Sequence, residues 1–94
     1  MITIRQAMKA LLQEEALSGL ELSQRLSVPE KEVYEHLQHL ARAPGHGWRF
    51  HIVPAVCRTC GFTFTKRDRL TPPSRCPVCR QQSIKRPRFA LEAR

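Results

Sequence analysis

Four cysteines are the residues of this sequence whose type and spacing most directly imply chemistry. They form two Cys-x-x-Cys pairs, Cys57 with Cys60 and Cys76 with Cys79, and fifteen residues separate the pairs. Zinc binds four thiolates in a tetrahedron, and each pair can supply one edge of that tetrahedron. We therefore predict one zinc ion with a structural role, bound by all four cysteines.

The neighbours of the cysteines fit this prediction. Gly61 follows Cys60 and permits the positive φ angle that the turn around a metal requires, and Pro77 stiffens the turn after Cys76. Iron is the alternative metal, because a four-thiolate site also holds one iron atom in rubredoxin-like electron carriers. The spacing alone does not separate the two metals.

Catalysis is not expected from these residues. Four protein thiolates leave no open position on the metal for a water molecule or a substrate. The rest of the sequence contains no recognisable Ser/His/Asp or Cys/His motif. We therefore predict neither enzymatic activity nor a small-molecule substrate.

The charge of the chain is distributed unevenly. Residues 1–41 carry four Lys and Arg against six Glu, a net charge of −2, whereas residues 42–94 carry twelve basic residues against two acidic ones, a net charge of +10. This asymmetry indicates an anionic partner for the second half.

The expected cellular compartment rests on the lack of a membrane span and of a signal peptide in this sequence. No apolar run is long enough to span a membrane, and the first residues do not form the apolar stretch of a signal peptide. We therefore expect a cytoplasmic protein without membrane contact. Because the cytoplasm is reducing, paired cysteines there indicate metal binding before disulfides.

Two capping boxes predict where the first two helices begin. Thr3 and Gln6 fit the first box, at the start of a helix that runs to about Ala16. Ser18 and Glu21 fit the second box, at the start of a shorter helix. Apolar residues then recur at helical spacing after each box.

Residues 21–40 have the pattern of a helix–turn–helix. Ser23 is the small residue that lets the second helix cross the first, and Ser27 fits the turn between them. Pro29 suits the first position of the second helix, which should continue to about Arg42. An ordinary helical hairpin shares this periodicity, but the ordered anchors favour the DNA-binding motif. These anchors are Leu22, Leu26, Val28, Val33 and Leu37.

The second helix of such a motif lies in the major groove of DNA, with its first turns at the base edges. Its outward positions predict four base contacts: Lys31, Tyr34, Glu35 and Gln38. Because this helix is acidic, affinity for phosphates must come from the basic half. We predict six phosphate contacts there: Arg58, Lys66, Arg67, Arg69, Lys85 and Arg86. His36 is expected to be a hydrogen-bonded structural residue.

Three short strands are predicted in the second half. Residues 48–53 alternate and are rich in strand-forming side chains, and residues 62–65 form a shorter run of the same kind. Residues 84–91 could form a third strand, which Pro87 would restrict to the edge of a sheet.

The order of these parts, with Cys-x-x-Cys-Gly-Phe and Cys-Pro-x-Cys directly after the helices, resembles a known family. Its members are small predicted transcriptional regulators, mostly archaeal, that join a winged helix to a rubredoxin-like zinc ribbon. The similarity rests on four pieces of the sequence: residues 33–37, 57–64, 74–79 and 87–89.

The resemblance implies an α+β fold, in which a three-helix winged helix–turn–helix has a small β-sheet and a four-cysteine zinc ribbon in its wing region. The winged helix would take residues 1–53 and the ribbon residues 54–83. Residues 84–94 would form a strand that returns to the winged-helix sheet, beside residues 48–56. Three apolar side chains would then lie against the helices: Phe50, Ile52 and Phe89.

The resulting prediction is a zinc-stabilised, DNA-binding transcriptional regulator with double-stranded DNA as its partner. A homodimer remains open, since the exposed side of the first helix could pair. The alternative is a non-catalytic protein–protein or RNA-binding adaptor that uses the winged helix as a docking platform. The acidic second helix favours that alternative.

Overall fold

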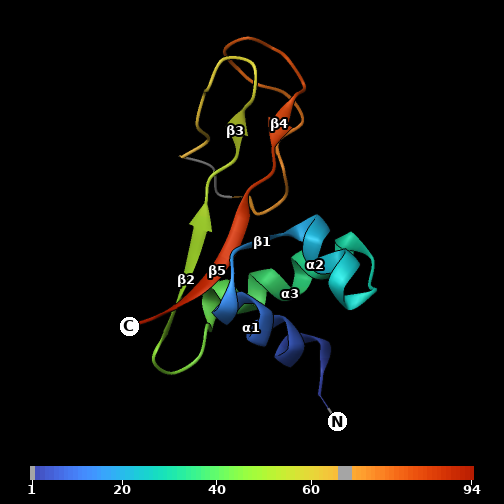
Figure 1. Ribbon diagram of the computed structural model, residues 1–94, viewed down its shortest axis with the longest axis vertical. Helices are drawn as coiled ribbons and strands as arrows, with labels where there is room; N and C mark the ends of the chain where they lie inside the picture. The colour runs from blue at the N-terminus through green and yellow to red at the C-terminus, as the bar shows by residue number, and fades with distance from the viewer. Residues whose placement is uncertain (1, 66–68) are drawn as a thin grey trace.

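The computed structural model describes residues 2–65 and 69–94. Three helices pack against a three-stranded sheet, and a two-stranded sheet stands beyond them in a molecule of 46 × 29 × 19 Å (Figure 1). No helix within these residues is long and apolar enough to cross a membrane. The elements in chain order are α1 Ile4–Glu14, β1 Leu17–Ser18, α2 Gly19–Leu26, α3 Glu30–Arg42, β2 Trp48–Val53, β3 Val56–Cys57, β4 Ile84–Lys85 and β5 Arg88–Ala93.

Both predicted capping boxes are present. Thr3 and Gln6 exchange hydrogen bonds at the start of α1, and Ser18 and Glu21 do so at the start of α2. These bonds satisfy N–H groups that the first turn of a helix leaves free. Helix α1 ends at Glu14, slightly before the predicted end, because the chain extends there to enter β1.

The turn between α2 and α3 is closed by the two serines that the sequence singled out. Ser27 adopts the left-handed conformation, with φ of 56°, and ends α2. The Ser23 hydroxyl donates a hydrogen bond of 2.5 Å to the carbonyl of Val28. Pro29 precedes α3 as its N-cap instead of forming its first helical residue. The helix then runs to Arg42, as predicted.

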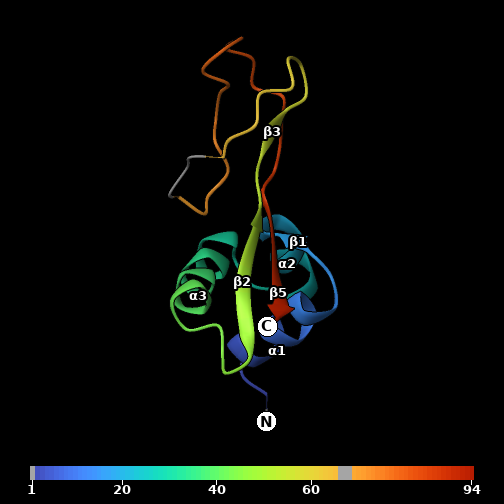
Figure 2. The same ribbon diagram turned by 90° about the vertical axis from the view of Figure 1, so that its left-hand side faces the viewer.

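The larger sheet has the strand order β1-β5-β2, and both pairs are antiparallel (Figure 2). Strand β5 is therefore central, although it comes last in the chain. Phe89 lies opposite Leu17 on one side and Ile52 on the other. The pairing of residues 48–53 with the C-terminal strand, which the resemblance implied, is observed.

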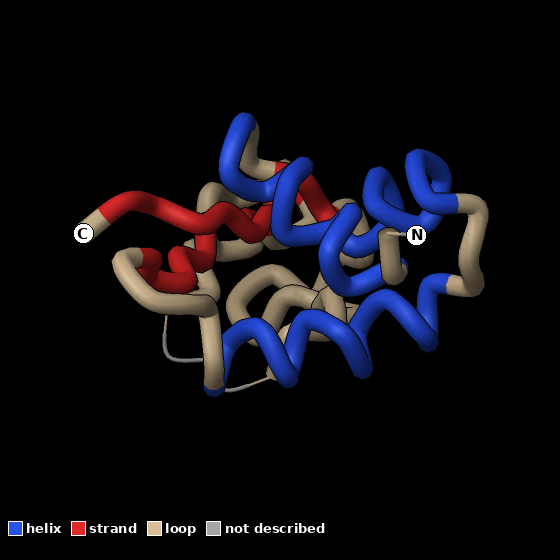
Figure 3. The backbone as a smooth tube through the Cα atoms, turned by 90° about the horizontal axis from the view of Figure 1, so that it is seen from below, coloured by secondary structure: helices blue, strands red, loops and turns tan. Residues whose placement is uncertain are grey.

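Two strand predictions are wrong. The predicted strand over residues 84–91 is divided into β4 and β5, because Pro87 lies in the break between them. Pro87 therefore does not restrict β5 to an edge. Residues 62–65 form no strand, and only Thr63 makes an isolated bridge, to Val56. Viewed from below, the loops that carry the cysteines lie behind the helices (Figure 3).

The core lies between the three helices and the inner face of the larger sheet. Phe89 is fully buried, and the ring of Phe50 stacks on it with centroids 5.9 Å apart. Ile52 lies beside α3, as predicted, because it lines a pocket with Ala41 and Arg42, but it stays 40% exposed and outside the buried core. The buried cluster consists of Met8, Leu12, Leu17, Leu22, Val33, Tyr34, Leu37, Leu40, Phe89 and Leu91.

Tyr34 belongs to this core, so the prediction that it faces outward is wrong. The reason is Gly19 at the start of α2. A Cβ atom on Gly19 would lie 2.5 Å from the Tyr34 hydroxyl oxygen, so only glycine leaves room for the ring. The close approach lets α3 turn Tyr34 inward beside Val33.

Candidate metal centre and nucleic-acid interface

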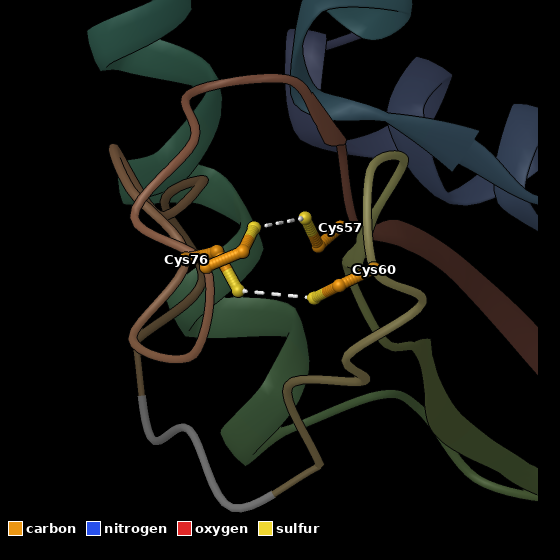
Figure 4. A group of neighbouring side chains, drawn as sticks. Cys57, Cys60 and Cys76 are labelled. Carbon is orange, nitrogen blue, oxygen red and sulfur yellow. Dashed lines mark hydrogen bonds between the residues drawn. The ribbon is translucent and has the colours of Figure 1, made fainter.

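The four predicted ligands converge on one point. Cys57 ends β3 and Cys60 lies in the turn that follows, opposite Cys76 in the turn before β4 (Figure 4). Cys79 lies in the same turn as Cys76. All four sulfur atoms are within 4.8 Å of one another. The Cys57–Cys79 sulfurs are 3.5 Å apart and the Cys60–Cys76 sulfurs 3.6 Å apart. A tetrahedron with bonds of about 2.3 Å has edges of roughly 3.8 Å, so one metal ion fits between them.

The two turns around the sulfurs have the same backbone hydrogen bonds. In each turn the first cysteine donates its N–H to the carbonyl five residues later, and its own carbonyl accepts from the N–H four residues later. These bonds measure 2.8 to 3.0 Å and join Cys57 to Phe62 and Gly61, and Cys76 to Gln81 and Arg80. The ribbon, which we define as residues 54–85, therefore presents its ligands from two matching turns.

Matching positions in the two turns have matching backbone angles. Gly61, after Cys60, has φ of 82°, and Arg80, after Cys79, has φ of 63°. The positive φ of Gly61 was predicted. That of Arg80 was not, because an arginine gives no signal of a left-handed conformation.

Backbone N–H groups favour the thiolate form of Cys57 and Cys76, whereas burial and the neighbouring cysteines raise the pKa of Cys60 and Cys79. The N–H of Cys60, together with that of Thr59, lowers the pKa of Cys57 to about 6. The N–H of Val78 lies 3.4 Å from the Cys76 sulfur. Since the thiolate is the form that binds a metal, these bonds prepare the site for a cation.

The ribbon and the residue that follows it both contact the helices directly. Arg86, just beyond β4, donates from Nη1 to Glu30 Oε1 at the start of α3, at 2.5 Å. Leu70 packs against the core cluster. The segment that contains Leu70, residues 69–72, therefore lies beside α3 (Figure 2).

A groove of about 490 Å³ separates this segment from the helix. Thr71 and Pro72 form its ribbon side. Its helical side consists of Glu30, Lys31, Tyr34, Glu35 and Gln38, so all four predicted base contacts line it. We call this surface the α3 groove.

The side chains of the predicted base contacts differ in solvent exposure. Lys31, Glu35 and Gln38 are exposed. Tyr34 is only 9% exposed, and its hydroxyl lies 3.3 Å from Glu30 Oε1. Burial, with the nearby Glu30 carboxylate, raises the pKa of Tyr34 to about 12. A side chain held in this way is not available to read a base edge.

The predicted phosphate contacts do not form one surface. Arg58 and Lys85 line an open depression together with Arg86 and Arg88. Arg69 lies elsewhere, beside the C-terminal part of α3. Two more predicted contacts, Lys66 and Arg67, lie outside the residues that the structure describes. Arg88 was not among the predicted contacts, because its place beside Arg58 depends on strand pairing that the sequence does not reveal.

His36 differs from its prediction. Its Nδ1 is buried and has no hydrogen-bond partner among residues 2–65 and 69–94. Its Nε2 is 3.7 Å from Glu32 Oε1, which is too far for a hydrogen bond. The expected hydrogen-bonded histidine is therefore not observed.

These features define a small α+β protein in which three helices cover a three-stranded sheet and a four-cysteine, rubredoxin-like zinc ribbon with its own two-stranded sheet is inserted before the last strand. Residues 3–45 match the family described as PF0610-like, N-terminal, and residues 54–94 match the PF0610 rubredoxin-like zinc β-ribbon domain. The solution NMR structure of protein PF0610 from Pyrococcus furiosus is 35% identical in sequence, with a TM-score of 0.79 over 97% of this chain and 90% of that chain. The chain belongs to the PF0610 family. Among curated proteins, no sequence matches it.

Proposed function

We propose that this protein is a zinc-stabilised, DNA-binding transcriptional regulator built on a winged helix–turn–helix. The observation that carries this proposal is the turn of residues 27–29, which joins two helices packed on a third helix and a small sheet. A turn of this length is typical of helix–turn–helix motifs, whose second helix reads DNA. Here that helix is α3, with Lys31, Glu35 and Gln38 exposed.

The second half of the chain would supply the affinity for DNA. Helix α3 begins with two glutamates, Glu30 and Glu32, and cannot attract a polyanion by itself. The net charge of +10 in residues 42–94 can do so through phosphate contacts. Arg86 joins the two parts, because its ion pair removes Glu30 from the free acidic charges of α3.

The α3 groove sets a condition on base contacts. A helix with its side chains is about 10–12 Å wide, and the major groove of DNA is about 12 Å wide. The major groove of DNA therefore cannot hold α3 together with the adjacent residues 69–72. Reading bases with Lys31 and Gln38 therefore requires this segment to move away from α3.

Selection of bound sequences from a random pool of duplex DNA tests the proposal. The wild-type protein should enrich a defined sequence. Combining Lys31→Ala with Gln38→Ala should relax that sequence preference. The combination Arg5→Ala with Gln13→Ala removes the same charge from α1 and should leave the preference unchanged. Enrichment that the α3 variant does not alter would contradict the role of this helix.

Zinc is the metal we propose for the four-cysteine site. Sulfur ligands suit zinc and iron alike, so the arrangement is consistent with both. A ferric four-thiolate site absorbs visible light, whereas a zinc site does not. Metal analysis of the purified protein, together with its absorption spectrum, should show one colourless zinc ion. A coloured protein with one iron would favour an electron carrier.

A second candidate function is a non-catalytic protein–protein or RNA-binding adaptor. The observation that favours it is the α3 groove, which is lined by Glu30 and Glu35 and partly covered by the ribbon. A gel shift that compares random duplex DNA with structured RNA at moderate salt separates the two candidates. Preference for RNA, or binding to neither nucleic acid, would favour the adaptor.

A further inference from the structure

Four basic side chains surround an open depression of about 240 Å³ where the ribbon meets the start of α2. Strand pairing brings them together from distant parts of the chain. Arg58 follows β3 and Lys85 belongs to β4, which pairs with β3. Arg88 lies on β5 directly opposite Ser18. The lining is completed by Arg86, Ser18 and Glu21.

The positive charge of this depression is largely uncompensated. Of its basic residues, Arg86 pairs with Glu30. The Glu21 carboxylate accepts a hydrogen bond from the Ser18 N–H in the capping box. Within residues 2–65 and 69–94, the side chains of Arg58, Lys85 and Arg88 have no acidic partner.

One nitrogen in this cluster lacks the partner that buried polar atoms normally have. Arg88 Nε is buried and makes no hydrogen bond in the described part of the chain. Buried N–H groups are nearly always paired with protein atoms, water or a ligand. An anion in the depression would offer this N–H an acceptor.

We propose that the depression lined by Arg58, Lys85 and Arg88, which we call the phosphate site, binds a phosphate group. Guanidinium groups match phosphate oxygens with two parallel hydrogen bonds, and a lysine adds a compact charge. The group is either a phosphodiester of nucleic acid or free phosphate. Its assignment to nucleic acid rests on the proposed function, whereas binding of the phosphate group does not.

A phosphodiester at this site would also position α3. Arg86 lines the phosphate site and at the same time binds Glu30, the first residue of α3. A backbone phosphate held there would lie one arginine side chain away from the first turn of the helix. Contacts of this kind fix the register of a protein on a duplex without reading its sequence.

The first arm of the test adds inorganic phosphate to the metal-loaded protein and follows the backbone amide NMR signals. Chloride at the same ionic strength is the reference anion. Saturable shifts are expected at residues 18, 58, 85 and 88. The double variant Arg58→Gln, Lys85→Gln should lose them, and it should fold because both side chains are exposed. The double variant Arg75→Gln, Arg80→Gln removes the same charge from exposed ribbon positions outside the site and should keep them.

The second arm measures affinity for duplex DNA over a range of salt concentrations. Loss of one phosphate contact should lower the slope of log affinity against log salt by about one in the Arg58, Lys85 variant and not in the control. Phosphate shifts without any DNA binding would support the site for free phosphate and refute the proposed function. Absence of saturable shifts, or shifts that survive in the double variant, would overturn the phosphate site, whatever DNA binding shows.

Discussion

Arg80 holds a backbone conformation that glycine holds at the matching position of the first metal-binding turn. Its φ of 63° is unfavourable for a residue with a Cβ atom, whereas Gly61 adopts 82° without that penalty. The hydrogen bond from the Arg80 N–H to the Cys76 carbonyl holds this angle. The second turn is therefore built on the same plan as the first, with a less suitable residue.

Replacing Arg80 by glycine should raise the free energy of unfolding of the metal-loaded protein by about 1 kcal/mol, because the left-handed strain disappears. Denaturant unfolding measures the change. The control Gln82→Gly, at an exposed position without positive φ, should give no gain. A glycine at position 80 that left stability unchanged would show that the angle carries no strain.

Gly19 determines the orientation of Tyr34, and a substitution there should show it. A Cβ atom at position 19 would lie 2.5 to 2.6 Å from atoms of the Tyr34 ring, so Gly19→Ala should destabilise the protein by about 1–3 kcal/mol. In a Tyr34→Ala background the same change should cost much less. Equal costs in both backgrounds, measured by denaturant unfolding, would show that the two residues are not coupled.

At the residue scale, the sequence predicted the role of a residue correctly where its type and its immediate neighbours determine that role. Two Cys-x-x-Cys pairs and Gly61 fall in this class. Prediction failed for Tyr34, whose orientation depends on a glycine in another helix. It also failed for Arg80, because an arginine gives no signal of the left-handed angle that its turn requires.

At the element scale, the ribbon segment of residues 69–72 controls access to α3. Leu70 packs against the core cluster and holds this segment beside the helix. The α3 groove is the surface that results. The proposed sequence-specific binding by α3 would therefore compete with the packing of Leu70.

Replacing Leu70 by alanine should loosen the segment and strengthen sequence-specific DNA binding, with a modest loss of stability from the smaller apolar contact. Fluorescence anisotropy with the selected duplex would measure the affinity. Val78→Ala, at a ribbon position that is 64% exposed, is the matched control and should leave affinity unchanged. Weaker binding by Leu70→Ala would mean that the segment supports the interface instead of covering it.

The helices could be predicted closely because capping boxes and apolar spacing are local signals. The strands could not, since a strand exists only through its partner. Residues 62–65 alternate like a strand, yet Phe62 and Phe64 meet edge to face, with ring centroids 5.0 Å apart. The break at Pro87 separates pairing with β3 from pairing with β1 and β2, and neither partner is evident from neighbouring residues.

At the scale of the whole molecule, the metal should control whether the basic half is ordered. Most of the ribbon lies outside the apolar core, and its two strands have two residues each. A segment this small seldom folds without a metal or disulfides. The proposed DNA binding depends on that segment for its positive charge.

Removal of the metal by a chelator should unfold residues 56–83, keep α1 to α3 largely formed, and abolish DNA binding. Circular dichroism would report the helices, amide NMR signals the ribbon, and anisotropy the binding. Returning zinc should restore both the ribbon signals and the affinity. DNA binding that persists without metal would assign the site to another role.

The central position of β5 has a consequence for how the protein folds during synthesis. All three helices are complete by residue 42, but the fully buried Phe89 that covers their apolar face is made only after the whole ribbon. A nascent chain that stops within the ribbon exposes that face to chaperones and to other chains. Metal bound by the cysteines beside β3 and β4 would close the loop that the ribbon forms. Pairing of β5 with β1 and β2 would then be faster. The availability of metal during translation could therefore decide the yield of folded protein.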